Sequence, residues 1–97
     1  MPKAYIVACY RELKNADALT DYAKIAGPAV KENGGRFLAR GGRVASLEGG
    51  IEERTVIIEF DSFEAAVAHY NSDAYKAALV ALGDAAVRDM RVVEGVE

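Results

Sequence analysis

The sequence predicts a single α+β domain that spans residues 1–97 and has the element order β-α-β-β-α-β. Three observations lead to this prediction: compact apolar runs typical of buried strands, apolar residues at helical spacing between them, and no linker or low-complexity tract. A chain of this length is the size of one domain. The order is the ferredoxin-like pattern, a four-stranded antiparallel sheet with both helical units on one face.

The first half of the chain begins with a strand and a long helix. Residues 4–10 form an apolar run rich in β-branched and aromatic side chains, which predicts a buried strand. Apolar residues recur at helical spacing from residue 17 to residue 33. Asn15 or Asp17 is expected to cap the start of this helix. Pro28 is expected to kink the helix or to restart it.

Glycine pairs divide the middle of the chain. Gly34-Gly35 is expected to end the long helix in a left-handed turn. Residues 36–40 and 43–47 are expected to form strand on either side of Gly41-Gly42, which predicts a bulge or sharp bend. A hairpin loop with a third glycine pair follows.

The second half repeats the alternation of strand and helix. Residues 54–60 form the clearest strand pattern of the chain. Asp61-Ser62 is expected to cap a short helix that ends at Tyr70, and Ser72 to cap another helix. Residues 88–96 are expected to form the last strand. Right-handed crossovers then place the first and third strands in the middle of the sheet.

Both central strands are apolar on both sides, which predicts a dimer. In the first strand Ile6 and Ala8 face one way, and Tyr5 and Val7 face the other. A sheet with one wet face alternates apolar and polar residues. Because both helical units cover the same face, the other face needs a cover that the chain does not contain. We expect a two-fold homodimer, sheet against sheet, that forms a dimeric α/β barrel.

The composition of the chain argues against several classes of function. The net charge of −3 argues against a nucleic-acid binder or an anionic-membrane binder. An RNA-recognition module shares the element order, but it needs stacking aromatics in both central strands, and residues 55–59 have none. No stretch is long and apolar enough for a membrane span. The single cysteine, Cys9, excludes an internal disulfide, and a cytoplasmic location is expected.

Three side chains are candidates for catalysis: Arg40, Glu59 and His69. Arg40 beside a glycine pair would clamp a carboxylate or enolate, or else pair with Glu59. Glu59 interrupts an apolar strand and would act as a general base or form a salt bridge. His69 is a candidate acid or base if it faces the sheet. However, the pattern Phe63, Ala66, Val67 and Tyr70 defines the expected buried face and puts His69 at its margin.

Four tyrosines are candidates for substrate binding: Tyr5, Tyr22, Tyr70 and Tyr75. They would line a pocket and present hydroxyl groups to a ligand, or else simply pack in the core. The sequence shows no serine–histidine–acid triad and no phosphate-binding loop. With one histidine and one cysteine, we expect no metal site and no tightly bound cofactor.

A series of short motifs runs along the chain. They are Gly34-Gly35-Arg36-Phe37-Leu38-Ala39-Arg40-Gly41-Gly42-Arg43, Glu48-Gly49, Val56-Ile57-Ile58-Glu59-Phe60-Asp61-Ser62, Tyr70-Asn71-Ser72-Asp73-Ala74-Tyr75 and Val93-Glu94-Gly95. In this order they resemble the family catalogued as domain of unknown function 1330, over nearly the whole chain. The resemblance implies a dimeric α/β barrel. That superfamily includes cofactor-free monooxygenases, lactone isomerases and haem proteins, so the resemblance assigns no reaction.

Two positions depart from the pattern of that family. His69 stands where an aromatic residue, often tryptophan, commonly precedes the tyrosine, and residues 81–83 lack an arginine that often occurs there. Two functions follow as hypotheses. The first is binding of a small organic molecule in a pocket between sheet and helices, with cofactor-free acid–base catalysis. The second is a non-catalytic dimeric module that binds a ligand or is associated with stress.

Overall fold

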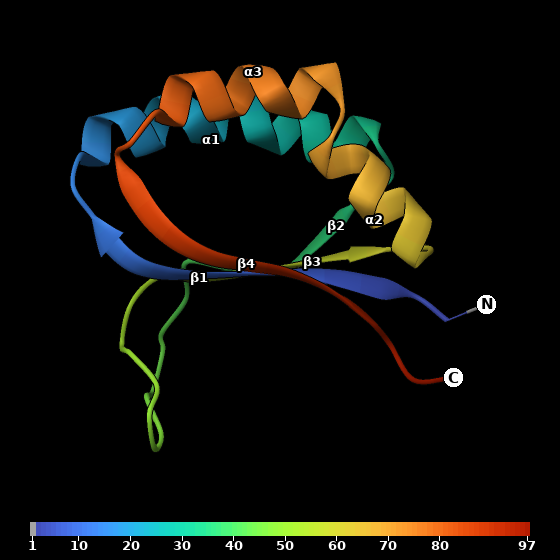
Figure 1. Cartoon of the computed structure of the whole chain (residues 1–97), viewed down its shortest axis with the longest axis horizontal. Helices are drawn as coiled ribbons and strands as arrows, with labels where there is room; N and C mark the ends of the chain where they lie inside the picture. The colour runs from blue at the N-terminus through green and yellow to red at the C-terminus, as the bar shows by residue number, and fades with distance from the viewer. Residues whose placement is uncertain (1) are drawn as a thin grey trace.

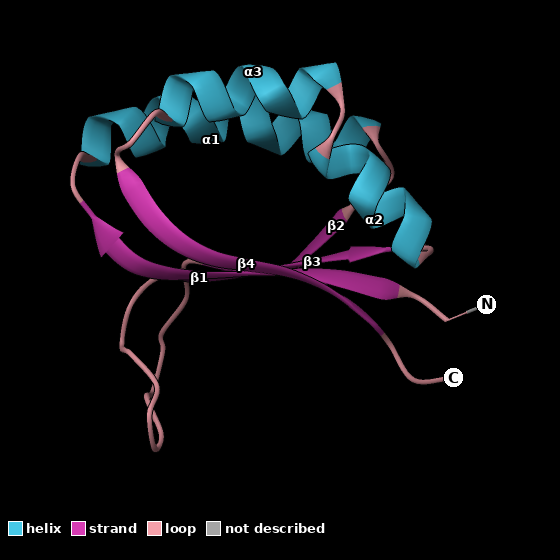
Figure 2. Ribbon diagram, in the orientation of Figure 1, coloured by secondary structure: helices cyan, strands magenta, loops and turns pink. Residues whose placement is uncertain are grey.

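The computed structural model describes residues 2–97, within which four strands and three helices form one α+β domain (Figure 1). The elements are β1 (Ala4–Leu13), α1 (Ala16–Glu32), β2 (Arg36–Arg40), β3 (Thr55–Phe60), α2 (Phe63–Tyr70), α3 (Asp73–Leu82) and β4 (Ala86–Glu94). The strands pair antiparallel in the order β2-β3-β1-β4. All three helices lie on one face of this sheet (Figure 2). The predicted ferredoxin-like fold, with the two most apolar strands in the centre, is confirmed.

The core lies between the sheet and the helices. Alternate residues of β1 point toward the helices and are buried: Ala4, Ile6, Ala8 and Tyr10. Ile6 pairs with Ile58 of β3 on one side and with Val92 of β4 on the other, so their side chains share this face. Apolar burial on this face is the main stabilising contribution to the domain.

The turn from α1 to β2 is built by a glycine pair, as predicted. Gly34 has a φ of 85°, a left-handed conformation that favours glycine. The N–H of Gly35 donates to the carbonyl of Val30 at 2.8 Å, which closes a Schellman motif. A Cβ atom on Gly35 would lie 2.8 Å from side-chain atoms of Val30 and Phe60. The pair therefore ends α1 and lets the chain pass close to the core.

The expected restart of the first helix at Pro28 is wrong. α1 is a single helix, and the Asn15 side chain caps it by accepting hydrogen bonds from two backbone N–H groups of the first turn. Proline removes one helical hydrogen bond. Pro28 itself faces solvent, whereas its neighbours Ala29 and Val30 are buried against the rest of the domain. Packing on both sides of Pro28 keeps the helix continuous.

The strand expected at residues 43–47 is not formed either. β2 ends at Arg40, Gly41 adopts a φ of 71°, and the chain continues as a loop until Thr55. The irregularity in the β2–β3 pairing lies between Phe37 and Ala39, not at the glycine pair. The loop leaves the sheet on the side away from the helices (Figure 1).

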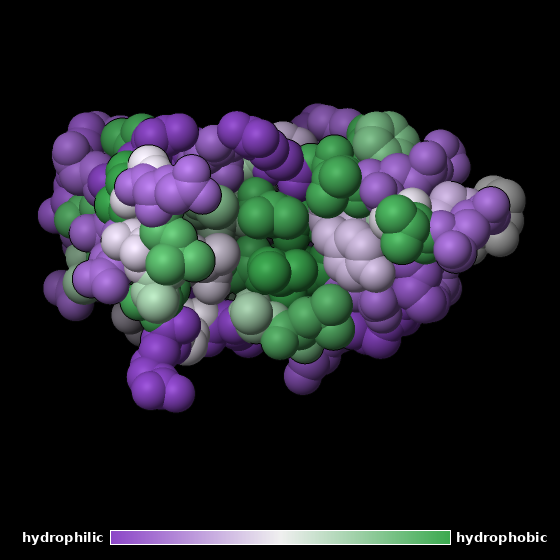
Figure 3. Space-filling model, turned by 90° about the horizontal axis from the view of Figure 1, so that it is seen from below, coloured by the Kyte–Doolittle hydropathy of each residue, from purple (hydrophilic) through white to green (hydrophobic). Residues whose placement is uncertain are grey.

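The sheet face away from the helices is uncovered in the single chain (Figure 3). Its centre is apolar and includes Val7 and Ile57, which pair directly across β1 and β3. Leu38 of β2 is 56% exposed, and the loop below the sheet exposes Leu47 by 78%. Hydrophilic residues lie along much of the border of this patch (Figure 3).

Candidate functional site

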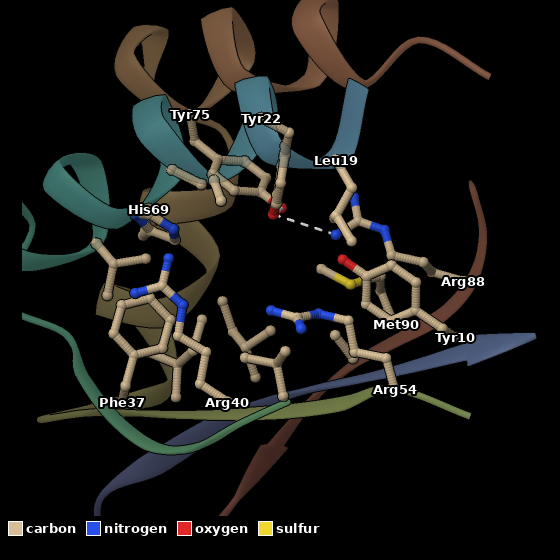
Figure 4. A pocket seen from close by; sticks show the side chains of 17 residues that line it. Tyr10, Leu19, Tyr22, Phe37, Arg40, Arg54, His69, Tyr75, Arg88 and Met90 are labelled. Carbon is tan, nitrogen blue, oxygen red and sulfur yellow. Dashed lines mark hydrogen bonds between the residues drawn. The ribbon is translucent and has the colours of Figure 1, made fainter. Parts of the chain in front are cut away.

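A cavity of about 30 Å³ lies between the helices and the inner face of the sheet (Figure 4). Part of its wall is apolar and comes from the sheet, namely Ile6, Ala8, Val56, Ile58 and Met90. Small residues of α1, Ala23 and Ala26, leave space on the opposite side. The polar part of the wall consists of three tyrosines, three arginines and one histidine.

Two tyrosines and an arginine form a hydrogen-bonded chain in the cavity. The hydroxyl groups of Tyr22 and Tyr75 are 2.5 Å apart, and Nη1 of Arg88 donates to the Tyr22 hydroxyl at 3.1 Å. Burial raises the pKa of Tyr75, so this phenol keeps its proton at neutral pH. Burial works against the charged form of Arg88, but the neighbouring tyrosine oxygens outweigh it and raise the pKa of the guanidinium.

The same arginine is held by aromatic rings. Its guanidinium carbon lies 5.0 Å from the ring centre of Tyr22 and 5.5 Å from that of Tyr10. A cation over an aromatic face is attracted by the ring quadrupole. The ring centre of Tyr10 also lies 5.8 Å from the guanidinium carbon of Arg54, so one ring lies near two cations.

His69 is buried in the wall of the cavity, which corrects the expectation that it lies at the margin of its helix. Its exposure is 1%, whereas Val67 and Tyr70, which were expected to be buried, are 36% and 38% exposed. Its ring centre lies 5.1 Å from that of Phe60 and 4.8 Å from that of Tyr75. Burial lowers the pKa of His69, so the ring is neutral at pH 7.

Hydrogen bonds fix the tautomer of this ring. The Ser72 hydroxyl donates to the His69 carbonyl at 2.7 Å, so toward Asn33 its oxygen acts as an acceptor. Asn33 Nδ2 is therefore a donor, and it lies 2.9 Å from His69 Nδ1. Nδ1 accepts this bond, and the ring proton resides on Nε2. Nε2 is buried and has no hydrogen-bond partner within the described part of the chain.

The other two arginines approach from β2 and from the start of β3. Arg40 stacks on Phe37, with its guanidinium carbon 4.3 Å from the ring centre, and it passes close to α1 at Gly27. The side chain of Arg54 reaches into the cavity (Figure 4). Its Nε is buried and lacks a hydrogen-bond partner among residues 2–97. The cavity thus combines cations, phenols and a neutral imidazole.

The model of the family described as Domain of unknown function (DUF1330) matches residues 3–96. The chain belongs to this family. No curated protein matches the sequence. The likeness therefore extends over nearly the whole DUF1330 chain but brings no assigned activity with it.

Solved structures show the same fold as this DUF1330 chain. A protein of unknown function from Rhodopseudomonas palustris superposes with a TM-score of 0.76 at 21% identity, covering 99% of this chain and 84% of the other. A proposed antibiotic biosynthesis monooxygenase from Caulobacter crescentus superposes with a TM-score of 0.65 at 23% identity, covering 99% and 92%. At these identities the likeness concerns the fold, and the function must be argued from the site.

Four of the seven candidate residues named from the sequence of this DUF1330 chain meet in the cavity. They are Arg40, His69, Tyr22 and Tyr75. They come from three different helices and one strand, so only the fold brings them together. A cavity therefore lies between the sheet and the helices, where the sequence predicted a pocket.

The remaining three candidates lie outside the cavity. Glu59 is on the uncovered face of the sheet, where its carboxylate accepts a hydrogen bond from Arg36 Nε at 2.9 Å. Glu59 is therefore a salt-bridged residue on the side opposite the cavity. Tyr5 points to the same uncovered face, close to Gly95. Tyr70 is partly exposed and touches the cavity only through Tyr75, with ring centres 5.3 Å apart.

Sequence reasoning missed three residues of the site. Tyr10 and Arg88 had a detectable signal, because they occupy the same strand parity as Ile6 and Met90, which face the helices. Arg54 had the same kind of signal, because in the strand expected at residues 54–60 it shares the parity of Val56 and Ile58, which face the helices.

Proposed function

We propose that this protein binds a small polar organic molecule in the cavity between sheet and helices and acts on it by acid–base chemistry. The observation that carries the proposal is the presence of two buried donors without partners, Arg54 Nε and His69 Nε2, in the wall of one cavity. Leaving such a donor unsatisfied costs about 1–3 kcal/mol in a folded protein. A ligand that accepts hydrogen bonds would recover this cost.

The acid–base part rests on the chain of hydroxyl groups. Tyr75 keeps its proton, and Arg88 donates to Tyr22, so the pair can supply a hydrogen bond to a ligand oxygen. When solvent hydroxide removes a proton from the neighbouring carbon and forms water, the negative charge that develops on this oxygen, as in an enolate, would be stabilised by the fixed guanidinium of Arg88. His69 presents an N–H group and does not accept a proton at Nε2 in this tautomer.

Binding is tested by ligand-observed NMR with a set of small polar fragments. Ala8 is 4% exposed and lines the cavity, so Ala8→Val fills part of the space. We expect this variant to lose fragment binding. Ala77→Val adds the same volume on the exposed side of α3 and serves as the matched control. Equal binding by wild type, Ala8→Val and Ala77→Val would contradict the proposal.

The acid–base step is tested separately with pyruvate in D₂O. If the site transfers protons, wild type accelerates exchange of methyl hydrogen for deuterium, and Tyr75→Phe reduces this acceleration by about 10²-fold or more. No acceleration by wild type would favour the second candidate function, a non-catalytic ligand-binding module. The absence of any carboxylate from the cavity wall supports this second candidate, because no strong base faces the ligand.

We also propose that the protein is a homodimer joined through the uncovered sheet face. The apolar centre of this face, with Val7 and Ile57, and the exposed Leu47 on the loop below it would be buried by a second copy. The Arg36–Glu59 ion pair borders the patch, so a two-fold axis would bring compensated charges to the rim of the interface.

Light scattering tests the dimer. We expect wild type to have twice the 10.4 kDa mass of one chain, and Val7→Glu to have the mass of one chain. Val80 lies on the outer side of α3 and is 82% exposed, so Val80→Glu is the control and should leave the dimer intact. A wild-type particle of single-chain mass at micromolar concentration would contradict the interface.

The cellular location stays a prediction. Within residues 2–97, no helix has the length and apolar character needed to cross a lipid bilayer. We keep the cytoplasm as the expected location and small molecules, not nucleic acid or membrane lipid, as the expected ligands.

A further inference from the structure

Five of the seven arginines of the chain fall into two groups. Arg36 and Arg91 on the uncovered face form ion pairs, with Glu59 and Asp89 respectively. Arg40, Arg54 and Arg88 line the cavity, and no carboxylate is among the side chains of its wall. Among the described residues none of these three forms a salt bridge. Three cations therefore converge without a counter-ion in a chain whose net charge is negative.

A glycine lies close to each of the two cations that lack a hydrogen-bond acceptor. A Cβ atom on Gly27 would lie 3.4 Å from Nη2 of Arg40, in the middle of α1. A Cβ atom on Gly41 would collide with the guanidinium of Arg54, and the φ of 71° at this position also favours glycine. The backbone thus leaves room for the guanidinium of Arg54 at Gly41, whereas at Gly27 a Cβ atom would make only an ordinary contact with the guanidinium of Arg40. Figure 4 shows them reaching into the same space as the imidazole of His69.

Every polar group on this side of the cavity is a donor. Arg40 and Arg54 have no acceptor atoms, and His69 presents its Nε2 proton because Nδ1 accepts from Asn33. An acceptor with a full negative charge satisfies such a set better than a neutral carbonyl, since charge-assisted hydrogen bonds are about twice as strong. The planar guanidinium matches the two oxygens of a carboxylate.

The rest of the wall selects the remainder of the ligand. Ile58, Val56 and Met90 are apolar, and the cavity is small, which favours a short ligand. Inorganic phosphate or sulfate would leave acceptors facing these apolar side chains, which is costly. A short aliphatic group attached to a carboxylate would contact them instead.

We propose that the ligand of this cavity is a small aliphatic carboxylate, held by Arg54 and Arg40 with His69 Nε2–H as a further donor. This inference rests on the proposed function, since it names the chemical class of the molecule that the cavity binds. Arg88 remains with Tyr22 and Tyr75 at the other end, where the carbonyl or enolate oxygen of the same molecule would lie.

The test compares propionate with propionamide, which has the same shape and no charge. Calorimetric titration of wild type should show propionate binding at least about tenfold more tightly than propionamide. Arg54→Met should reduce the affinity for propionate at least about tenfold, and Arg54→Lys, which keeps the charge but not the planar fork, should also weaken it. Arg43→Met, in the exposed loop, is the matched control and should bind as wild type does.

Each outcome decides for or against the inference. Equal affinity for acid and amide, or unchanged propionate affinity in both Arg54 variants, would overturn it. If fragments bind and Ala8→Val abolishes their binding while propionate has no advantage, the proposed function stands and only the carboxylate assignment falls. Inorganic phosphate that binds more tightly than propionate would also overturn the assignment in favour of a fully polar anion.

Discussion

The two faces of the sheet use arginine in opposite ways. On the uncovered face, Arg36 lies between Glu59 and Asp61, with N–O distances of 2.9 and 3.0 Å, and its charge is neutralised by the chain itself. Beneath the helices, no carboxylate is among the residues that line the cavity with Arg54 and Arg40. Because the charges of the arginines on the uncovered face are compensated, this face is compatible with the packing of a second copy of the chain. Arginines beneath the helices remain available to a ligand.

The largest difference between the faces is expected in apolar packing. Ile58 and Ile57 are neighbours on β3, but Ile58 is 7% exposed in the core and Ile57 lies on the uncovered face. Ile58→Ala should lower the free energy of unfolding by about 3 kcal/mol. Ile57→Ala should cost less, and its cost should grow with protein concentration because the proposed dimer would cover Ile57. Urea denaturation at two concentrations measures both, and equal, concentration-independent losses would break the comparison.

The next effect concerns the hydroxyl pair in the cavity. Tyr22→Phe leaves the hydroxyl of Tyr75 and one N–H of Arg88 without this partner, so we expect a loss of about 1–2 kcal/mol in the free energy of unfolding. The double variant Tyr22→Phe/Tyr75→Phe should lose less than the sum of the two single variants. Strict additivity in this double-mutant cycle would show that the two hydroxyl groups do not interact.

A pH effect distinguishes the buried imidazole from the surface carboxylates. Burial lowers the pKa of His69 in the folded state below its ordinary value of 6.5. Above pH 6.5 the imidazole is neutral in both the folded and the unfolded chain, so the free energy of unfolding keeps its full value with respect to this group. As pH falls below this value, the unfolded chain takes up a proton that the folded chain does not, and the free energy of unfolding drops. The drop is about 1.4 kcal/mol for each unit of difference between the two pKa values.

Thermal or urea denaturation between about pH 7 and pH 5 measures this dependence, which should be flatter in His69→Gln. The surface carboxylates Asp61 and Asp89 do not interfere in this range. Their arginine partners lower the pKa of both below 3.8, so they lose stabilisation only at more acidic pH. An unchanged pH dependence in His69→Gln would contradict the burial of a neutral ring.

The smallest effect is expected on the uncovered face. Arg36 is 46% exposed and pairs with the 76% exposed Asp61, so Arg36→Met should change the free energy of unfolding less than any of the variants above. The change should shrink further at high salt, because screening weakens exposed ion pairs. A larger, salt-independent loss would mean that the pair is buried in the folded protein, for example within the proposed dimer.

The fold was predictable from sequence because its signals are local. Helix caps such as Asn15 and Ser62, and the apolar runs of β1 and β3, require only neighbouring residues to be recognised. The predicted strand at residues 43–47 failed because a suitable run of residues pairs only if a neighbouring strand edge is within reach. Gly41 turns the chain away from the sheet before such pairing occurs.

The site was predictable only in part. Arg40 and Tyr22 were named because their residue types suggest chemistry, but their meeting with Arg54 and Arg88 depends on side-chain direction. His69 was misplaced because its helix has only eight residues and buries a narrow stripe, Ala66 and His69, in place of the larger apolar side chains. Propensity and periodicity favour large apolar residues for burial, whereas here the hydrogen bond from Asn33 makes histidine the better buried residue.

The claim that arginines beneath the helices are held for a ligand is tested most directly by the stability of ligand-free Arg54→Met. The account predicts a free energy of unfolding equal to or above that of wild type, because the variant removes a partly buried cation whose Nε lacks a partner. A loss as large as the about 3 kcal/mol expected for Ile58→Ala would contradict it. Arg54 would then be a structural residue of the core.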